Sequence, residues 1–546
     1  MSRRPPGSRR KLLVGAALVI ALAGAAAALF LGLNDPATRP APEDGAYVEG
    51  VAGTWKRVNP LFATTNEVDQ DLVQLVFAGL VRLGPTGEVM PDLAALPAVS
   101  DDGKTYTFRL RRGLRWHDGQ PLTSADVAFT IAALTSPGFK GEPSLADPWL
   151  AIEVETPDEL TVVFRLSQAY APFLARHATL GILPEHLLGD LSGAGLLEAP
   201  FNAAPVGAGP YMLKSLDSTE AVLEPYPEYH LGRPQVARLR LRFFSDYPST
   251  LRALQQGEVA GVMFREGITD AQLADLKAVK GVDLAYPQRG AYLILYLNND
   301  QAAYFQDERV RRAISLALDR EQIVARVYSG VATPSSSAVA PGTWAYADKY
   351  DLVEPRLDEA RRLLEEVGWN PHATTGILIR EGSEFRITIR TDNDSLRVAV
   401  ANEVARQLQQ IGIRATVAST TFSVLRRDFL QERKYDAAIA GWDQGPDPDP
   451  YFGWHSSQMG TAGLNLANFA DVVADSLIAK GRTDSDIEVR RDSYRQFQEV
   501  WQELSPSIVI AYPRYTYAYP SALKGLKPGV LFSAAARFAD IHRWTY

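Results

Sequence analysis

The sequence contains no cysteine among its 546 residues. This absence excludes disulfide bonds, iron–sulfur clusters, cysteine-ligated zinc and catalysis by a thiolate. It also excludes membrane attachment through a lipidated cysteine. The absence does not favour any compartment, because a chain of this length can bury a core large enough to be stable without disulfides.

Sequence patterns of several common active sites are also missing. There is no Gly-x-Ser-x-Gly elbow, Walker loop or Rossmann glycine fingerprint, and no two of the seven histidines have the spacing of a helical zinc motif. Residues 34–546 carry a net charge of −13 once the five N-terminal positive charges are removed, and no basic tract interleaves with aromatics. We therefore expect no catalytic residues, no metal ligands, no cofactor and no nucleic-acid partner.

The first 46 residues have the pattern of an export or anchoring segment. Residues 1–11 hold all five of those positive charges, and residues 12–33 form an uncharged apolar run of 22 residues. A helix of roughly 20 residues spans a bilayer, and the basic flank favours a cytoplasmic N-terminus. We expect 1–11 to be cytoplasmic, 12–33 to be a transmembrane anchor or a cleaved signal, and Pro-rich residues 34–46 to be a tether. The remainder is then extracytoplasmic, at the outer face of the cell membrane.

Apolar periodicity predicts an α/β protein. Strands are expected at residues 291–297, 385–390, 413–418 and 507–512, and they alternate with amphipathic helices at 357–367, 396–411 and 487–504. This alternation favours largely parallel sheets. A β-rich stretch near residues 88–205 interrupts it, and there Thr123 with Asp126 predicts a capped helix.

One loop is the strongest candidate site. Residues 441–458 read GWDQGPDPDPYFGWHSSQ and directly follow a predicted strand at 435–440. Proline fixes the backbone and restricts the residue before it, so the loop is expected to be stiff. Open α/β sheets place ligands at the carboxyl ends of strands. Its candidate ligand-binding residues are three carboxylates and two tryptophans, namely Asp443, Asp447, Asp449, Trp442 and Trp454.

Two roles for these carboxylates can be compared. Asp447 and Asp449 could be the acid and base of a secreted hydrolase. However, residues two apart in an extended segment point to different sides, so they are poorly placed to flank one bond. We expect one carboxylate to face a ligand and another to hold the loop. The hydrolase remains an alternative.

Several long stretches occur in an informative order along the chain. They are YTFRLRRGLRWHDGQPLTSADVAFT from Tyr106, DERVRRAISLALDREQIV from Asp307, LDEARRLLEEVGW, the DPDP loop, NLANFAD and YPRY. Together they resemble the family 5 extracellular solute-binding proteins of ABC importers, the oligopeptide- and dipeptide-binding type. The resemblance implies a two-lobed type II periplasmic-binding-protein fold with an extra β-rich subdomain, and no catalysis. Lobe I would comprise residues 47–290 and 505–546, with its subdomain near 88–205, and lobe II residues 291–504.

The resemblance also implies a ligand and partners. The protein would bind peptides between its lobes as a monomer and deliver them to the permease subunits of an ABC importer. In peptide-binding relatives an Asp of the matching loop pairs with the peptide α-ammonium, which favours Asp447, followed by Asp449 and Asp443. Trp55 and Asn59, in the first loop after a strand, are expected at the lobe I edge. An oligosaccharide, an opine or a nickel chelate remains an alternative ligand.

Overall fold

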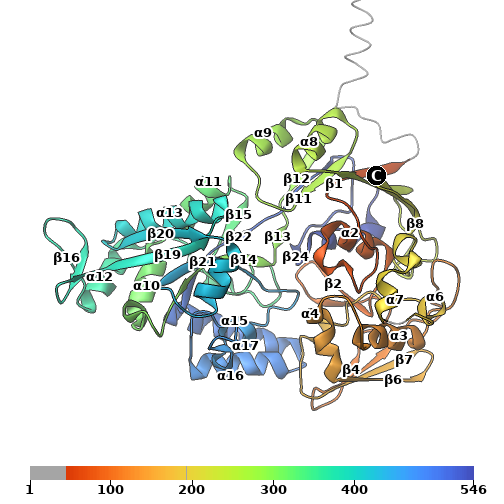
Figure 1. Ribbon diagram of the computed structural model, residues 1–546, viewed down its shortest axis with the longest axis horizontal. Helices are drawn as coiled ribbons and strands as arrows, with labels where there is room; N and C mark the ends of the chain where they lie inside the picture. Colours follow the sequence, from red (N-terminus) through yellow and green to blue (C-terminus); the bar gives the residue numbers. More distant parts are fainter. Residues whose placement is uncertain (1–44, 192) are drawn as a thin grey trace, which may run out of the picture.

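The computed structural model describes residues 45–191 and 193–546 (Figure 1). The basic segment 1–11, the apolar run 12–33 and most of the tether 34–46 lie outside these ranges. Within the ranges, no helix combines the length and apolar character needed to cross a membrane. The described chain forms two lobes, so the predicted two-lobed α/β fold is confirmed.

Lobe I (residues 45–287 and 514–546) is built on a seven-stranded mixed sheet. The central strand β1 runs parallel to β10 and β11, and the outer pairs are antiparallel. Helices α2 (Glu67–Val76), α8 (Tyr247–Gln256) and α9 (Asp270–Ala278) pack around it. In sheet order the strands are β12 (Val282–Ala285), β23 (Thr516–Pro520), β11 (Gly261–Phe264), β1 (Ala46–Ala52), β10 (Arg238–Phe244), β9 (Glu220–Pro225) and β8 (Tyr211–Leu216).

The part of the chain between β1 and β8 contains a separate β-rich unit. It is a four-stranded antiparallel sheet covered by α3 (Ser124–Thr135). The predicted capping box at the start of α3 is confirmed, because the Thr123 backbone N–H donates to Asp126 at 2.8 Å. The strands are β4 (Ala98–Val99), β5 (Thr105–Arg109), β7 (Thr161–Leu166) and β6 (Ile152–Asp158).

Lobe II (residues 290–513) is a six-stranded sheet between two layers of helices. Along β14 alternate side chains point to opposite faces, so Leu293 packs toward α10–α13 and Ile294 toward α16 and α17. The strands are β15 (Ala332–Pro334), β22 (Ser507–Pro513), β14 (Ala291–Leu297), β21 (Ala437–Asp443), β19 (Arg386–Asp392) and β20 (Arg414–Thr420). The helices are α10 (Glu308–Ala317), α11 (Arg320–Val327), α12 (Leu357–Glu366), α13 (Ser395–Gln409), α16 (Val472–Thr483) and α17 (Ile487–Leu504).

Two details of the predicted organisation are wrong. The sheets are mixed rather than largely parallel, because β14 pairs antiparallel with both β21 and β22. The expected return to lobe I at residue 505 is also too early. Strand β22 pairs with β14 and β15 and so belongs to lobe II, and the chain leaves that lobe only near Arg514.

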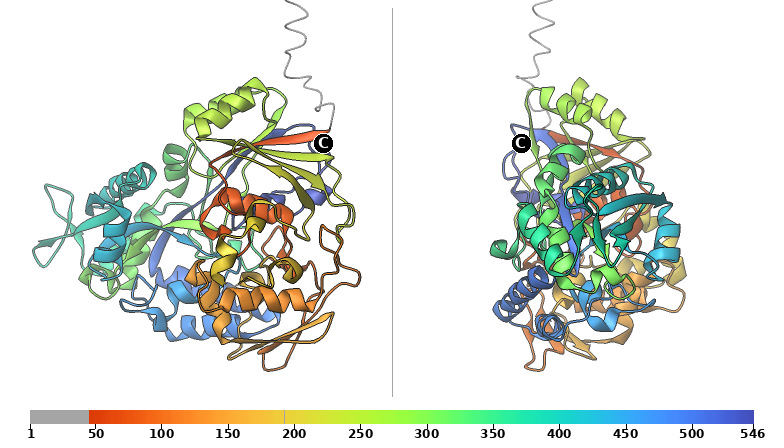
Figure 2. Two further views of the ribbon diagram at one scale, coloured as in Figure 1. Left: turned by 45° about the vertical axis from the view of Figure 1, so that its right-hand side comes forward. Right: turned by 90° about the vertical axis from the view of Figure 1, so that its left-hand side faces the viewer.

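The two segments that cross between the lobes lie side by side. Gln288 forms an isolated antiparallel bridge with Arg514, and the Tyr515 N–H donates to the Pro287 carbonyl at 3.1 Å. Strand β13 (Gln288–Arg289) also pairs with β24 (Val530–Leu531) of the C-terminal segment. The left view of Figure 2 shows the lobe II sheet on the left and lobe I on the right.

Candidate functional site

The acidic loop begins at the end of β21, where lobe II meets lobe I. Residues 441–443 continue the pairing with β14, and Asp443 lies opposite Ala291. Gln444 then fixes the exit of the strand. Its N–H donates to the Gly290 carbonyl at 3.0 Å, and its buried side chain bonds the backbone of residues 338 and 340. The chain reverses at Gly445, whose φ of 65° favours glycine.

The Asp447 carboxylate is buried inside lobe II. Its Oδ1 accepts from Arg490 Nη2 at 2.7 Å and from the Asp449 N–H at 3.1 Å. Burial by itself would lower the pKa of Arg490, but the charge and hydrogen bond of Asp447, together with Tyr494, raise that pKa above its usual value. Each charge therefore stabilises the other, and the pair attaches the loop to α17.

Asp449, two residues after Asp447, forms a second ion pair. Its buried carboxylate accepts from Arg482 of α16 and from the Tyr451 N–H at 3.1 Å. Burial raises the pKa of Asp449, and the Arg482 charge offsets that rise only in part. The guanidinium also lies over the Tyr451 ring, 4.1 Å from its centroid, and over the Tyr170 ring of lobe I at 4.7 Å. Asp449 therefore fixes the loop in this conformation.

Asp443 differs from both of these residues. It is exposed, its Oδ1 accepts from the Gly445 N–H at 2.9 Å, and no cation of the described chain forms an ion pair with it. Its negative charge affects the pKa of Tyr515, which lies at the crossing between the lobes. Burial raises the pKa of Tyr515, Arg289 opposes that rise, and the carboxylates of Glu67 and Asp443 add to it. Asp443 is thus the loop carboxylate with a free charge at the junction.

The two tryptophans of the loop have different environments. Trp454 is 1% exposed and packs edge-on against Trp501, with ring centroids 4.3 Å apart. Trp442 is half-buried, and its ring lies 3.2 Å from where a Cβ on Gly453 would be. Trp442 follows the face of β21 that packs on α16 and α17, so its side chain and that of Asp443 point to opposite faces. Trp454 is therefore a core residue in this conformation.

The two lobe I candidates also contact protein groups. Asn59 is fully buried, and its amide donates to Asn202 at 2.9 Å while its oxygen accepts from the Leu61 N–H. Trp55 is half-buried and donates from its indole to the Asp217 carbonyl at 2.7 Å. Both residues fix the first loop of lobe I. The structure does not bring either side chain to the Asp443 carboxylate.

A residue that no sequence pattern indicates joins the two lobes at the loop. Arg176 ends the short helix α5 (Phe173–Arg176) of the β-rich subdomain, and its Nη2 donates to the carbonyl oxygens of Gln444 and Asp447 at 2.8 and 3.3 Å. Nearby, the Ala171 N–H donates to the Arg482 carbonyl at 2.9 Å. Arginine next to a helix end is too common a feature to have predicted this contact.

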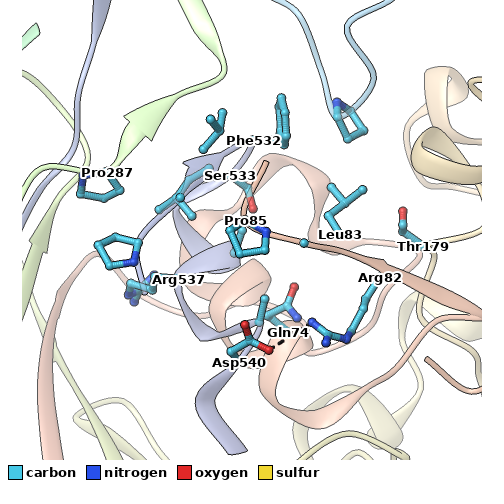
Figure 3. A pocket seen from close by; sticks show the side chains of 18 of the residues that line it. Gln74, Arg82, Leu83, Pro85, Thr179, Pro287, Phe532, Ser533, Arg537 and Asp540 are labelled. Carbon is cyan, nitrogen blue, oxygen red and sulfur yellow. Dashed lines mark hydrogen bonds and ion pairs between the residues drawn. The ribbon is translucent and has the colours of Figure 1, made fainter. Parts of the chain in front are cut away.

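A cavity of about 340 Å³ opens beside the same loop (Figure 3). Lobe I supplies most of its wall, from α2, the hairpin of β2 (Val81–Leu83) and β3 (Val89–Pro91), and residues 526–544. Pro446 of the lobe II loop and Pro287 of the first crossing segment complete the wall. The cavity therefore lies at the lobe junction. Pro446, the loop residue in its wall, is three residues after Asp443.

Solved structures that are similar to this chain include proteins in complex with a small ligand or a peptide. The solved structure of the oligopeptide-binding protein AppA from Bacillus subtilis, in complex with a nonapeptide, has a TM-score of 0.63 and 26% identity and covers 91% of this chain and 98% of its own. NikZ from Campylobacter jejuni, solved in complex with Ni(L-His), has a TM-score of 0.67 and 25% identity over 92% of this chain and 100% of its own. The fold and the site therefore define a solute-binding protein.

The sequence identifies the family. Residues 88–463, more than half of the chain, match the bacterial extracellular solute-binding proteins, family 5 (middle region). The curated sequence of AppA from Bacillus subtilis is 29% identical over 499 residues, which covers 89% of both chains. The chain belongs to the family 5 bacterial extracellular solute-binding proteins, as its ordered motifs predicted.

Proposed function

We propose that this protein is the extracytoplasmic receptor of an ABC importer, and that it binds peptides between its lobes and delivers them to the permease. Its similarity to the oligopeptide-binding protein AppA supports a peptide ligand. The single observation on which the proposed site rests is the exposed, unpaired carboxylate of Asp443 at the lobe junction. A charge-assisted hydrogen bond from an α-ammonium group to this carboxylate would orient the peptide.

In this proposal the three carboxylates of the loop have two roles. Asp443 receives the ligand ammonium, whereas Asp447 and Asp449 hold the loop through Arg490 and Arg482. The assignment reverses the order expected from the resemblance, which placed Asp447 first. Its physical reason is that a buried carboxylate already paired with arginine has no free charge to offer a ligand.

Lobe closure would complete the site. The side-by-side crossing segments near Gln288 and Arg514 are the two connections about which lobe I and lobe II would rotate. Arg176 and the Ala171 backbone would then meet lobe II only when the lobes are together. We assign residues 290–513 to lobe II, and the described residues before 288 and after 513 to lobe I.

The finer points of localisation and assembly follow the sequence. Residues 12–33 are proposed to hold the receptor at the outer face of the membrane, with residues 34–46 as a tether. The receptor acts as a monomer without catalysing a reaction on its ligand. A chelate of nickel with an amino acid is a second candidate ligand, favoured by the similarity to NikZ. Mass spectrometry of the ligand retained through native purification separates the two.

The test compares a free tetra-alanine peptide with its N-acetyl form on the full-length protein by calorimetry. Asp443→Asn is expected to weaken binding of the free peptide about thirtyfold or more, because loss of one partner of a charge pair costs about 2 kcal/mol or more. Binding of the acetylated peptide should change less than about threefold. Asp358→Asn, at an exposed position of α12 in lobe II, is the matched control. Equal losses for both peptides would exclude the ammonium-pairing role.

A further inference from the structure

The cavity beside Pro446 has the features of a binding pocket rather than of a packing defect. Its volume of about 340 Å³ lies within the range of ligand sites, roughly 300–1,000 Å³. Most of its wall is apolar, from Leu83, Pro85, Val530 and Phe532. A pocket of this size in a solvent-accessible junction would favour an apolar group that displaces its water.

Three polar side chains of the pocket lie together at the end away from Phe532. Figure 3 shows Gln74, Arg82 and Asp540 together at one end, with Pro85 and Phe532 toward the other. The Gln74 amide forms no side-chain hydrogen bond within the described ranges. Arg82 donates from Nη1 to Asp540 at 3.2 Å, and its Nη2 donates no hydrogen bond to a group in the same part of the chain. Donors are therefore available at this end.

The charge at this end is already balanced. Arg82 forms an ion pair with Asp540, so a ligand group that meets both needs no charge of its own. A charged group placed between Arg82 and Asp540 would be desolvated without a free counter-ion, which is costly. An apolar body with a neutral hydrogen-bonding tip fits best. Among side chains, tyrosine combines a large apolar ring with a hydroxyl that both donates and accepts.

The pocket is within reach of a peptide anchored at Asp443. Asp443 and Pro446 are three residues apart, so their Cα atoms are separated by no more than about 11 Å. An extended peptide advances about 3.3 Å per residue. A side chain among the first three or so residues of such a peptide can therefore enter the pocket, beside the wall formed by Pro446.

We propose that the cavity between Leu83, Phe532 and Pro446 receives a tyrosine side chain of the bound peptide, near its amino terminus. The inference rests on the proposed peptide-binding function and adds a side-chain preference to it. Gln74 and Arg82 hydrogen-bond the phenol hydroxyl, and Leu83 and Phe532 contact the ring. Peptides with tyrosine at one early position are then preferred over those with alanine, phenylalanine or glutamate there.

Calorimetry on the full-length protein tests this preference. Tetra-alanine is the reference, and tyrosine, phenylalanine or glutamate replaces each alanine in turn. Tyrosine at one of the first three positions should tighten binding at least tenfold over alanine and at least threefold over phenylalanine. Leu83→Trp, which fills the pocket, should remove this gain. Gln74→Leu should remove only the advantage of tyrosine over phenylalanine.

Leu96→Trp supplies the matched control, because Leu96 is 51% exposed and does not line the pocket. It should leave the whole preference unchanged. If the peptides bind with equal affinity whichever residue they carry, or if the preference for tyrosine persists in Leu83→Trp, the inference is wrong while the proposed function stands. If no peptide binds the wild-type protein, the proposed function fails and the inference fails with it.

Discussion

Arg176 Nη2 donates a hydrogen bond of 2.8 Å to the carbonyl oxygen of Gln444, and this bond joins the β-rich subdomain of lobe I to the acidic loop of lobe II. The same nitrogen reaches the Asp447 carbonyl at 3.3 Å. The contacts involve only backbone oxygens of the loop. Arg176 therefore couples the position of the subdomain to the shape of the loop that carries Asp443, without using a loop side chain.

Replacement of Arg176 should weaken the closed arrangement of the lobes. Hydrogen bonds from a charged donor contribute about 1.5–3 kcal/mol each. We expect Arg176→Ala to speed peptide dissociation about tenfold or more, with a smaller change in association, as measured by stopped-flow fluorescence. Arg165→Ala, in an exposed ion pair of the same subdomain, is the control. An unchanged dissociation rate would show that Arg176 does not act on closure.

The buried pair of Asp447 and Arg490 should matter for stability. Removal of one partner leaves an unpaired buried charge, which costs about 3–5 kcal/mol. Asp447→Ala is expected to lower the free energy of unfolding by that amount in urea denaturation followed by circular dichroism. Asp443→Asn should change it by less than about 0.5 kcal/mol, because Asp443 is exposed. Similar losses for both variants would contradict the separate roles given to these residues.

The stability of the fold should fall in mild acid. Burial lowers the pKa of His117 to about 4 from 6.5, despite opposing effects of the Gly209 carbonyl and Asp118. The unfolded chain therefore binds more protons than the native state between these values, so stability decreases as pH falls from about 6.5 to 4. One such group contributes at most about 3.5 kcal/mol, since one pKa unit is worth about 1.4 kcal/mol.

His117→Gln tests this pH dependence in thermal unfolding at pH 7 and pH 4.5. The variant should lose part of the difference between the two melting temperatures. It should keep another part, because burial also lowers the pKa of His177 to about 4. His372→Gln, on an exposed turn, should behave like the wild type. An unchanged pH dependence for His117→Gln would remove the role of this histidine.

Gly207 should not tolerate a side chain. A Cβ at this position would lie 1.8 Å from the Val76 carbonyl oxygen at the end of α2, and this backbone cannot move aside without disturbing the lobe I core. We expect Gly207→Ala to lower the free energy of unfolding by about 1–3 kcal/mol. Gly441→Ala is the control, since a Cβ there would lie 3.9 Å from its nearest neighbour, the Tyr292 carbonyl oxygen. Equal stability of the two variants would refute the steric argument.

The sequence predicts regular elements well where the local signal is strong. The helix at 487–504 and the strand at 291–297 have the bounds expected from their apolar periodicity. The site is harder to predict, because its contacts are distant in sequence. The arginine partner of Asp447 lies 43 residues further on, and that of Asp449 lies 33 residues further on. No local pattern distinguishes these carboxylates from the exposed Asp443.

The sheet directions are not predictable from alternation alone for a related reason. A strand followed by a helix suggests that the next strand lies parallel to it. The neighbours of β14 are instead β21 and β22, which pair with it antiparallel and come much later in the chain. The pairing of these strands depends on tertiary packing rather than on their own residues. For the same reason, the residue at which the chain leaves lobe II, near Arg514, cannot be predicted from the local sequence.

The position of β23 determines when each lobe can be completed during synthesis or export. This strand lies between β12 and β11 in the lobe I sheet, and Tyr517 pairs with Met263, roughly 250 positions earlier. All six strands of the lobe II sheet lie within residues 291–513. A polypeptide that emerges from its amino end therefore finishes its second lobe before its first, and the first remains an open sheet until almost the last residues arrive.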